Sequence, residues 1–143
     1  MGTIVCATRG GQGSRAVQLA AIDRAKERNE RLVFLYVVDV PLIKEYDEAL
    51  SGAMHAESHW LGEALLRVAQ QRAQREQVKA EIAIREGDVK EEIEAFLTES
   101  DAAVLMLGAP RGTTPTVFGD DAIERFAATI ENDTGVAVEI VRP

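Results

Sequence analysis

The sequence predicts a doubly wound α/β fold, a three-layer sandwich with a five-stranded, mainly parallel sheet and four helices. The first observation behind this prediction is that short, uninterrupted apolar runs alternate with stretches of helical periodicity. Strands that are buried on both faces and joined by helical crossovers have this pattern. The second observation is size and composition: 143 residues suit one domain, and 46% hydrophobic with 28% charged residues is typical of a globular chain. Residues 1–143 are therefore expected to form a single domain.

The first third of the chain predicts a strand, a helix and a second strand. Thr3–Thr8 is a short β-branched, apolar run followed by a glycine cluster. Ser14 is expected to cap the helix that follows, in which apolar residues recur at helical spacing as far as Ala25. Leu32–Val38 is a second uninterrupted apolar run, so the two strands are expected to pair in parallel.

The middle of the chain predicts one long helix and an edge strand. Pro41 stops the second strand, and a helix is expected from about His55 to Arg75, with Asp47–Met54 as its irregular beginning. Apolar and polar residues alternate over Val78–Arg85, which indicates a strand with one solvated face, at the edge of the sheet.

The last third predicts two more helix–strand pairs. A helix is expected over Val89–Thr98 and a buried strand over Ala102–Leu107. The final helix is expected over Asp120–Asn132, ended by Gly135 in a left-handed conformation, and Val136–Val141 forms the last strand.

Charge and composition exclude several classes of function. The 16 basic and 24 acidic residues give a net charge of −8, which disfavours binding to nucleic acid or to an anionic membrane. The apolar runs are far shorter than the ~20 residues that span a bilayer, and no secretory leader is expected before the first strand. Cys6, the single cysteine, is interpreted as a buried small hydrophobic residue. A cytoplasmic location is therefore expected.

Four segments, in this order, resemble the universal stress protein family along essentially the whole chain. They are the opening strand Ile4–Ala7 with Gly10 after it, Arg31–Asp39, the turn and helix start Arg85–Ile93, and the strand Asp101–Gly108. The resemblance implies the strand order 3-2-1-4-5 and, in many members, a dimer through the fifth strands. It also implies that some members bind ATP and others do not.

The chain departs from the pattern of the ATP-binding members. These carry an Asp at the end of the first strand and Gly-x2-Gly-x9-Gly-(Ser/Thr) after the fourth, so that backbone N–H groups approach phosphates. Here Arg9 replaces the Asp, the glycines are Gly108, Gly112 and Gly119, and Asp120 replaces the hydroxyl residue. We therefore expect a stress-response binding or regulatory module with a degenerate nucleotide crevice and no certain cofactor. The alternative is a switch protein that binds ATP or AMP and hydrolyses the nucleotide weakly.

Ligands of doubly wound sheets bind at the carboxyl ends of the strands. Arg9 and Arg111 follow the first and fourth strands, where guanidinium groups suit a small anionic ligand; the alternative is that Arg9 forms a salt bridge with Asp39 or Asp120. If a ligand binds, the expected contacts are Thr8, Arg9, Gly10, Val38, Gly108, Arg111, Gly112, Gly119 and Asp120.

No catalytic or metal site is expected. His55 and His59 lie four residues apart, but Glu57 between them points to another side of the helix, so we interpret them as part of a solvated face. Both histidines are in the middle of the chain, and no nucleophile, base and orienting group can be assembled. A binding protein is therefore favoured over an enzyme.

The final strand is expected to form a homodimer. Val136, Val138 and Ile140 lie on one face of a strand in which Glu139 is the single charge, so its edge is poorly protected against pairing. Antiparallel pairing with a second copy across a twofold axis closes this edge. The alternatives are a monomer whose edge is shielded by Asp39–Met54, or a dimer through another surface.

Overall fold

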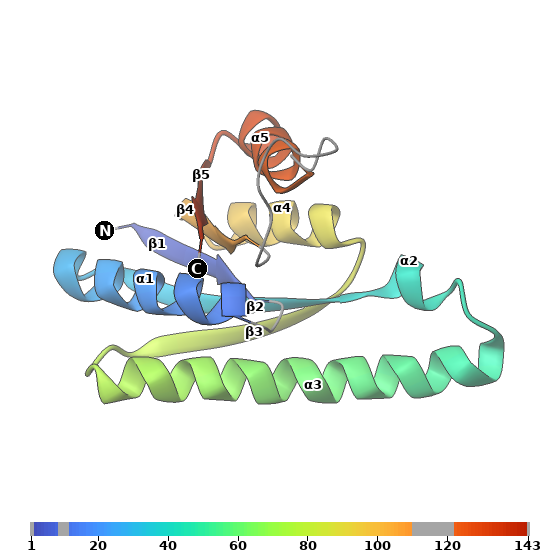
Figure 1. Cartoon of the computed structure of the whole chain (residues 1–143). Helices are drawn as coiled ribbons and strands as arrows, with labels where there is room; N and C mark the ends of the chain where they lie inside the picture. The colour runs from blue at the N-terminus through green and yellow to red at the C-terminus, as the bar shows by residue number, and fades with distance from the viewer. Residues whose placement is uncertain (1, 9–11, 110–121, 143) are drawn as a thin grey trace.

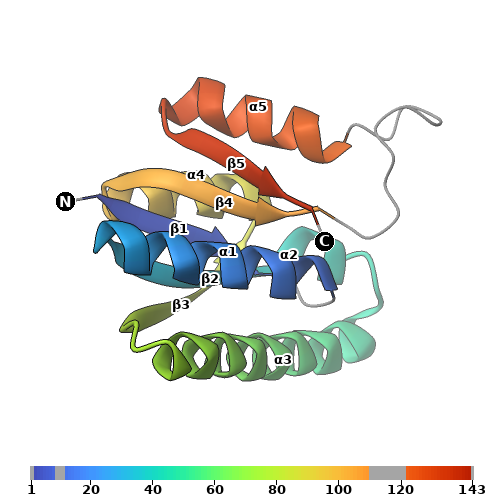
Figure 2. The same ribbon diagram turned by 60° about the vertical axis from the view of Figure 1, so that its left-hand side comes forward.

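A computed structural model describes residues 2–8, 12–109 and 122–142. Within these residues five parallel strands form one sheet in the order β3-β2-β1-β4-β5, which confirms the predicted fold class and strand order. Helices lie on both faces of the sheet (Figures 1 and 2). The elements are β1 (Thr3–Ala7), α1 (Gln12–Arg28), β2 (Arg31–Asp39), α2 (Val40–Ile43), α3 (Glu48–Arg75), β3 (Ala80–Gly87), α4 (Val89–Glu99), β4 (Ala102–Gly108), α5 (Ala122–Thr134) and β5 (Ala137–Val141).

Two hydrophobic cores lie on opposite faces of the sheet, because successive residues of each strand point to opposite sides. In β1, Ile4 and Cys6 pack toward α1 and α3, while Val5 packs toward α4 and α5. The central strands are buried on both faces, as their apolar runs predict. The strand β3, which alternates apolar and polar residues, lies at the edge of the sheet as predicted.

The described residues contain five helices rather than the four expected, because a one-turn helix, α2, follows β2 directly. The Asp39 carboxylate caps it by accepting a hydrogen bond from the Leu42 backbone N–H at 3.2 Å. Pro41 occupies the first turn of α2, where a missing N–H costs no hydrogen bond. Pro41 therefore ends the strand and also favours a short helix.

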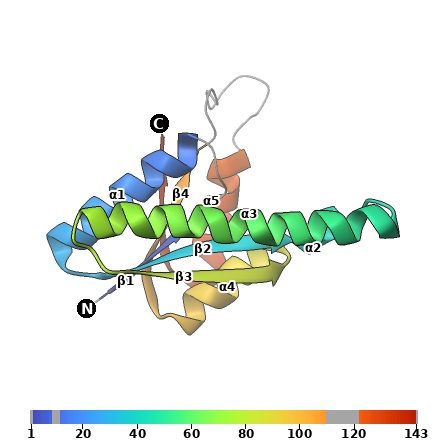
Figure 3. The same ribbon diagram turned by 90° about the horizontal axis from the view of Figure 1, so that it is seen from below.

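The long helix α3 begins at Glu48, so the segment Asp47–Met54, expected as an irregular beginning of the helix, is regular helix from Glu48 on. Asp47 provides the start, because its carboxylate accepts a hydrogen bond from the Leu50 N–H at 3.0 Å. Figures 1 and 3 show that this first part of α3 extends beyond the carboxyl end of β3. It therefore lacks the stripe of buried residues from which the sequence predicts a helix.

The start of α1 differs from the sequence prediction, and the end of α5 agrees with it. The expectation that Ser14 caps α1 is wrong, because α1 begins at Gln12 and Ser14 lies inside its first turn, with 8% of its surface exposed. Gly135 follows α5 with a φ of 73°, which confirms the left-handed end of that helix. The expected start of α5 at Asp120 lies outside the described residues.

Among the described residues, none of the helices is long and apolar enough to cross a membrane.

Candidate ligand-binding pocket

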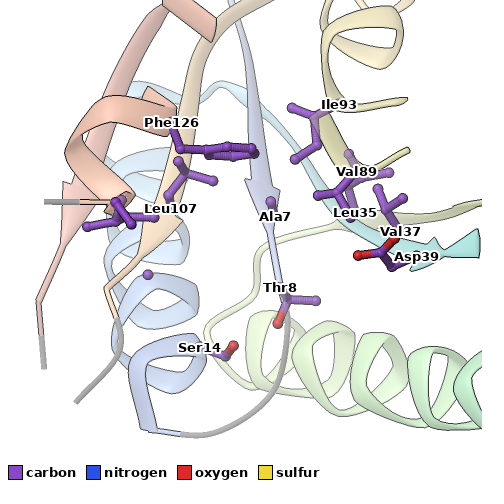
Figure 4. A pocket seen from close by; sticks show the side chains of 13 residues that line it. Ala7, Thr8, Ser14, Leu35, Val37, Asp39, Val89, Ile93, Leu107 and Phe126 are labelled. Atoms are coloured by element: carbon purple, nitrogen blue, oxygen red, sulfur yellow. The ribbon is translucent and has the colours of Figure 1, made fainter. Parts of the chain in front are cut away.

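A cavity of about 400 Å³ opens at the carboxyl ends of β1, β2 and β4, on the face of the sheet covered by α4 and α5 (Figure 4). Its volume lies within the range of about 300–1,000 Å³ that is usual for small-molecule sites. Most of the lining is aliphatic or aromatic. The lining residues are Ala7, Thr8, Ser14, Leu35, Val37, Asp39, Val89, Ile93, Leu107, Gly108, Ala122, Ile123 and Phe126.

Strand register explains why the cavity exists at this place. Ala7 pairs with Leu35 on one side and with Leu107 on the other, so these three residues share one level of the sheet. Ala7, at the centre of this row, contributes only a methyl group, which leaves space beneath α4 and α5. Ile93 from α4 and Phe126 from α5 project toward this space from opposite sides (Figure 4).

The polar residues among the described lining residues are Thr8, Ser14 and Asp39. The Asp39 carboxylate caps α2. The Thr8 hydroxyl oxygen accepts a hydrogen bond from Gln18 Nε2 at 2.8 Å. Ser14, the third polar residue, lies in the first turn of α1. The cavity is thus apolar over its walls and polar at the end formed by β1 and α1.

Of the residues expected to contact a ligand, Thr8 and Gly108 line the cavity. Val38 is not among the lining residues and is fully buried; its neighbours Val37 and Asp39 line the cavity instead. The alternation of side chains along β2 places the Val38 side chain on the opposite face of the sheet. The remaining expected contacts, Arg9, Gly10, Arg111, Gly112, Gly119 and Asp120, lie outside the described residues.

The sequence alone does not identify the apolar walls of the cavity. Ile93, Ile123 and Phe126 stand in the inward-facing stripes of α4 and α5, and such stripes predict burial. A residue that lines a pocket and one that fills a core have the same signal in a single sequence. Only the small size of Ala7 beside Leu35 and Leu107 distinguishes this region, and that depends on knowing the register.

The other conspicuous residues lie away from this cavity. His55 Nε2 lies 3.1 Å from Glu86 Oε1, and His59 Nδ1 lies 3.5 Å from Glu63 Oε1. Among the residues that the structure describes, no group of three His, Cys, Asp or Glu side chains is placed to hold a metal ion. Complete burial raises the pKa of the Cys6 thiol, which disfavours the nucleophilic thiolate.

Fold and cavity together define a doubly wound α/β protein with a cavity, large enough for a small molecule, at the ends of its central strands. Comparison with family models matches residues 1–129 to the universal stress protein family. The chain therefore belongs to that family. Comparison with curated proteins finds no match.

Solved structures of the same family have this fold. The universal stress protein UspA from Lactobacillus plantarum superimposes with a TM-score of 0.80 at 17% identity, covering 99% of this chain and 97% of that one. A universal stress protein in complex with cAMP gives a TM-score of 0.69 at 20% identity, covering 98% and 96%. The protein from Archaeoglobus fulgidus in complex with dAMP gives 0.69 at 13% identity, covering 99% and 97%.

Proposed function

We propose that this chain is a binding and regulatory module of the cytoplasmic stress response, whose cavity takes a flat, largely apolar ligand of about the size of a nucleoside. The observation that carries this proposal is the cavity of about 400 Å³, with apolar walls and a polar end, at the carboxyl ends of β1, β2 and β4. The module acts by binding its ligand rather than by chemical turnover.

The dimensions and lining of the cavity support a base-sized occupant. Ile93 and Phe126 face each other across a space that a planar ring fills, and burying such a ring against aliphatic side chains is favourable. Asp39 lies at the end of β2, on the cavity lining, and its carboxylate disfavours a second negative charge beside it. The cavity thus favours the base of a nucleotide over its phosphates.

The sequence around the cavity supports a ligand without a triphosphate. Gly108 is the only residue of the glycine pattern that lines the cavity within the described part of the chain. The sequence that follows carries Gly112, Gly119 and Asp120 where the ATP-binding pattern requires different spacing and a hydroxyl group. An acidic side chain in that position repels a phosphate instead of donating a hydrogen bond to it.

The second candidate function is a switch that binds AMP or ATP and hydrolyses nucleotide slowly. The observation in its favour is that two similar structures are complexes with adenine monophosphates, cAMP and dAMP. The two candidates differ in what the phosphates contribute. In the first, affinity resides in the base; in the second, each added phosphate and Mg²⁺ increases affinity.

Calorimetric titration with adenosine, AMP, cAMP, dAMP and ATP, each with and without Mg²⁺, separates the two candidates. The proposal predicts saturable binding of adenosine that changes less than about threefold with added phosphate and does not depend on Mg²⁺. Tighter binding of ATP than of adenosine, with Mg²⁺ dependence and release of phosphate, supports the switch instead. No binding by any member of this series contradicts both.

A cavity-filling variant tests whether the ligand occupies this site. Ala7→Phe places a ring in the centre of the cavity and is expected to reduce adenosine affinity by at least about tenfold, since the volume is no longer available. Ala128→Phe introduces the same side chain at an exposed position of α5 and serves as the matched control. Equal affinities in the two variants place the ligand elsewhere.

We also propose that the chain forms a homodimer through β5. This strand is the last of the sheet, and within the described residues α5 packs against one face of it. The segment considered as an alternative shield of this edge includes α2, which contacts β3 at the opposite edge of the sheet. Pairing with a second copy satisfies the outward N–H and C=O groups of β5.

A further inference from the structure

Gln18 is a buried polar residue that neither the fold nor the cavity lining explains. It lies on α1 with 2% of its surface exposed, and it hydrogen-bonds in two directions. Its Nε2 donates to Thr8 Oγ1 at 2.8 Å, and its Oε1 accepts from Arg72 Nη1 of α3 at 2.6 Å. A chain of hydrogen bonds thus connects Arg72, through Gln18, to a residue on the cavity wall.

The chemistry of these groups fixes the direction of every bond in the chain. A guanidinium group only donates hydrogen bonds, so the side of Gln18 that faces Arg72 is its carbonyl oxygen. The amide NH₂ then faces Thr8, whose oxygen must accept. The Thr8 hydroxyl proton is therefore directed away from Gln18.

The hydroxyl proton of Thr8 is available for a hydrogen bond to an acceptor other than Gln18. Thr8 is buried, with 1% of its surface exposed, and the hydroxyl makes no other hydrogen bond within the described part of the chain. Thr8 also lines the cavity, and in Figure 4 its hydroxyl lies at the end near Ser14. Because Thr8 lines the cavity, an acceptor on a ligand inside the cavity can satisfy this buried donor.

We propose that Thr8 is a hydrogen-bond donor of fixed polarity toward the cavity ligand, and that Gln18 and Arg72 are its positioning residues. The proposal rests on the proposed function, since it names which chemistry the bound ring presents. The ligand carries a hydrogen-bond acceptor, such as a ring nitrogen or a carbonyl oxygen, at the β1 end and apolar edges elsewhere. A ligand with an N–H at this place meets the Thr8 proton and is rejected.

A variant in which the Thr8 hydroxyl accepts a hydrogen bond from the ligand, instead of donating one, gives a direct test. In Gln18→Glu the carboxylate accepts from Arg72 and also from the Thr8 hydroxyl, so that Thr8 presents its lone pairs to the cavity. Three bicyclic probes of similar size report the change: quinoline has a ring acceptor, indole has an N–H donor, and naphthalene has neither. Affinities are measured by NMR titration of the full chain, following the methyl resonances of cavity residues such as Ile93 and Leu107.

The expected result is an exchange of preference. The wild-type chain binds quinoline about fivefold more tightly than naphthalene, and indole more weakly than either, as one net hydrogen bond implies. Gln18→Glu removes the advantage of quinoline and makes indole the preferred probe. Gln71→Glu adds the same charge at an exposed position of α3 and is expected to keep the wild-type order.

A second variant keeps the test decisive if Gln18→Glu does not fold. Thr8→Val keeps the shape of the side chain but removes the hydroxyl, so quinoline and naphthalene are expected to bind equally. Probes that bind to the wild-type chain without a preference for quinoline, or an order unchanged in these variants, overturn the role of Thr8 and leave the cavity as a ligand site. Failure of all three probes and of adenosine to bind overturns the proposed function itself, and this inference with it.

Discussion

Cys6 shows at the level of one residue how burial determines reactivity. Its side chain lies in β1 between α1 and the sheet, fully buried, and burial raises the pKa of the thiol. We predict that a disulfide reagent such as DTNB leaves the native chain unmodified and titrates one thiol after denaturation. Labelling of the folded chain is expected to be slower than that of the unfolded chain by at least about a thousandfold, because exposing the central strand requires global unfolding. Rapid labelling under native conditions contradicts this description of β1.

The ion pair between α4 and α5 gives a pH-dependent prediction. Lys90 Nζ lies 3.0 Å from Asp133 Oδ2, and this hydrogen bond holds the pKa of the Asp133 carboxyl below its ordinary value. A carboxyl whose pKa is lower in the folded state adds stability above about pH 4, and that stability is lost as the pH falls through the folded value. In Lys90→Met the pKa of Asp133 is therefore expected to rise toward the ordinary value.

The measurement is an NMR titration of the Asp133 side-chain carboxyl in wild type and Lys90→Met. Lys44→Met removes the same charge from the end of α2 and serves as the control. The difference in unfolding free energy between wild type and Lys90→Met is expected to shrink as the pH falls below about 4. An unchanged pKa in Lys90→Met would show that Lys90 does not interact with Asp133 in solution.

At the level of an element, two glycines in α3 have opposite roles. A Cβ atom added at Gly62 would overlap the Tyr36 ring, whereas one added at Gly52 has nothing within 4 Å. We predict that Gly52→Ala stabilises the chain by about 0.5–1 kcal/mol through helix propensity alone. Gly62→Ala is expected to destabilise the chain by about 1 kcal/mol, because the cost of the overlap with Tyr36 of β2 is larger than the gain in helix propensity.

Urea denaturation of the two variants tests this difference. Because both changes are glycine to alanine in one helix, the difference between them isolates the packing of α3 against Tyr36. Equal stabilisation by both substitutions contradicts the close approach of α3 to β2.

Individual strands and helices differ in how well a single sequence predicts them. Strands buried on both faces are recognised from their apolar runs, and so are helices with a buried stripe, such as the second half of α3. The first turns of α3 are predicted only as an irregular beginning, because they extend beyond the sheet and depend on the Asp47 cap. The face of the sheet on which the buried Val38 side chain lies is not given by its position in the sequence alone.

At the level of the whole molecule, the direction of backbone groups in β5 makes the dimer testable. The Val141 carbonyl accepts from the Ala109 N–H of the segment after β4 at 2.9 Å, so the Glu139 N–H also faces β4 and that of Val138 faces outward. We predict that Val138→Pro, which removes an outward donor, gives a folded monomer. Glu139→Pro breaks the ladder to β4 and is expected to destabilise the fold.

Sedimentation equilibrium of wild type and Val138→Pro measures this effect. A dimer mass that persists in folded Val138→Pro excludes β5 as the interface. A monomeric wild type contradicts the proposed assembly as a whole.

The sequence predicts the end of the sheet at which the ligand cavity lies, but not most of the residues that line the cavity. The position of the crevice at the end of the first strand follows from the doubly wound fold. Its apolar walls come from α4 and α5, which the sequence assigns to the core, and its polar end depends on Gln18 and Arg72, which are 54 residues apart in the chain. Contacts between distant elements of this kind require a structure.

Intermolecular NOEs between adenosine and the folded chain test the central claim, that this cavity holds a nucleoside-sized ligand, most directly. We expect NOEs from the base protons of adenosine to the methyl groups of Ile93, Leu107 and Ile123, which come from three elements and all line the cavity. The same NOEs are expected with AMP and are unaffected by Mg²⁺. Bound adenosine without these NOEs, or no bound adenosine at millimolar concentration, would contradict the claim.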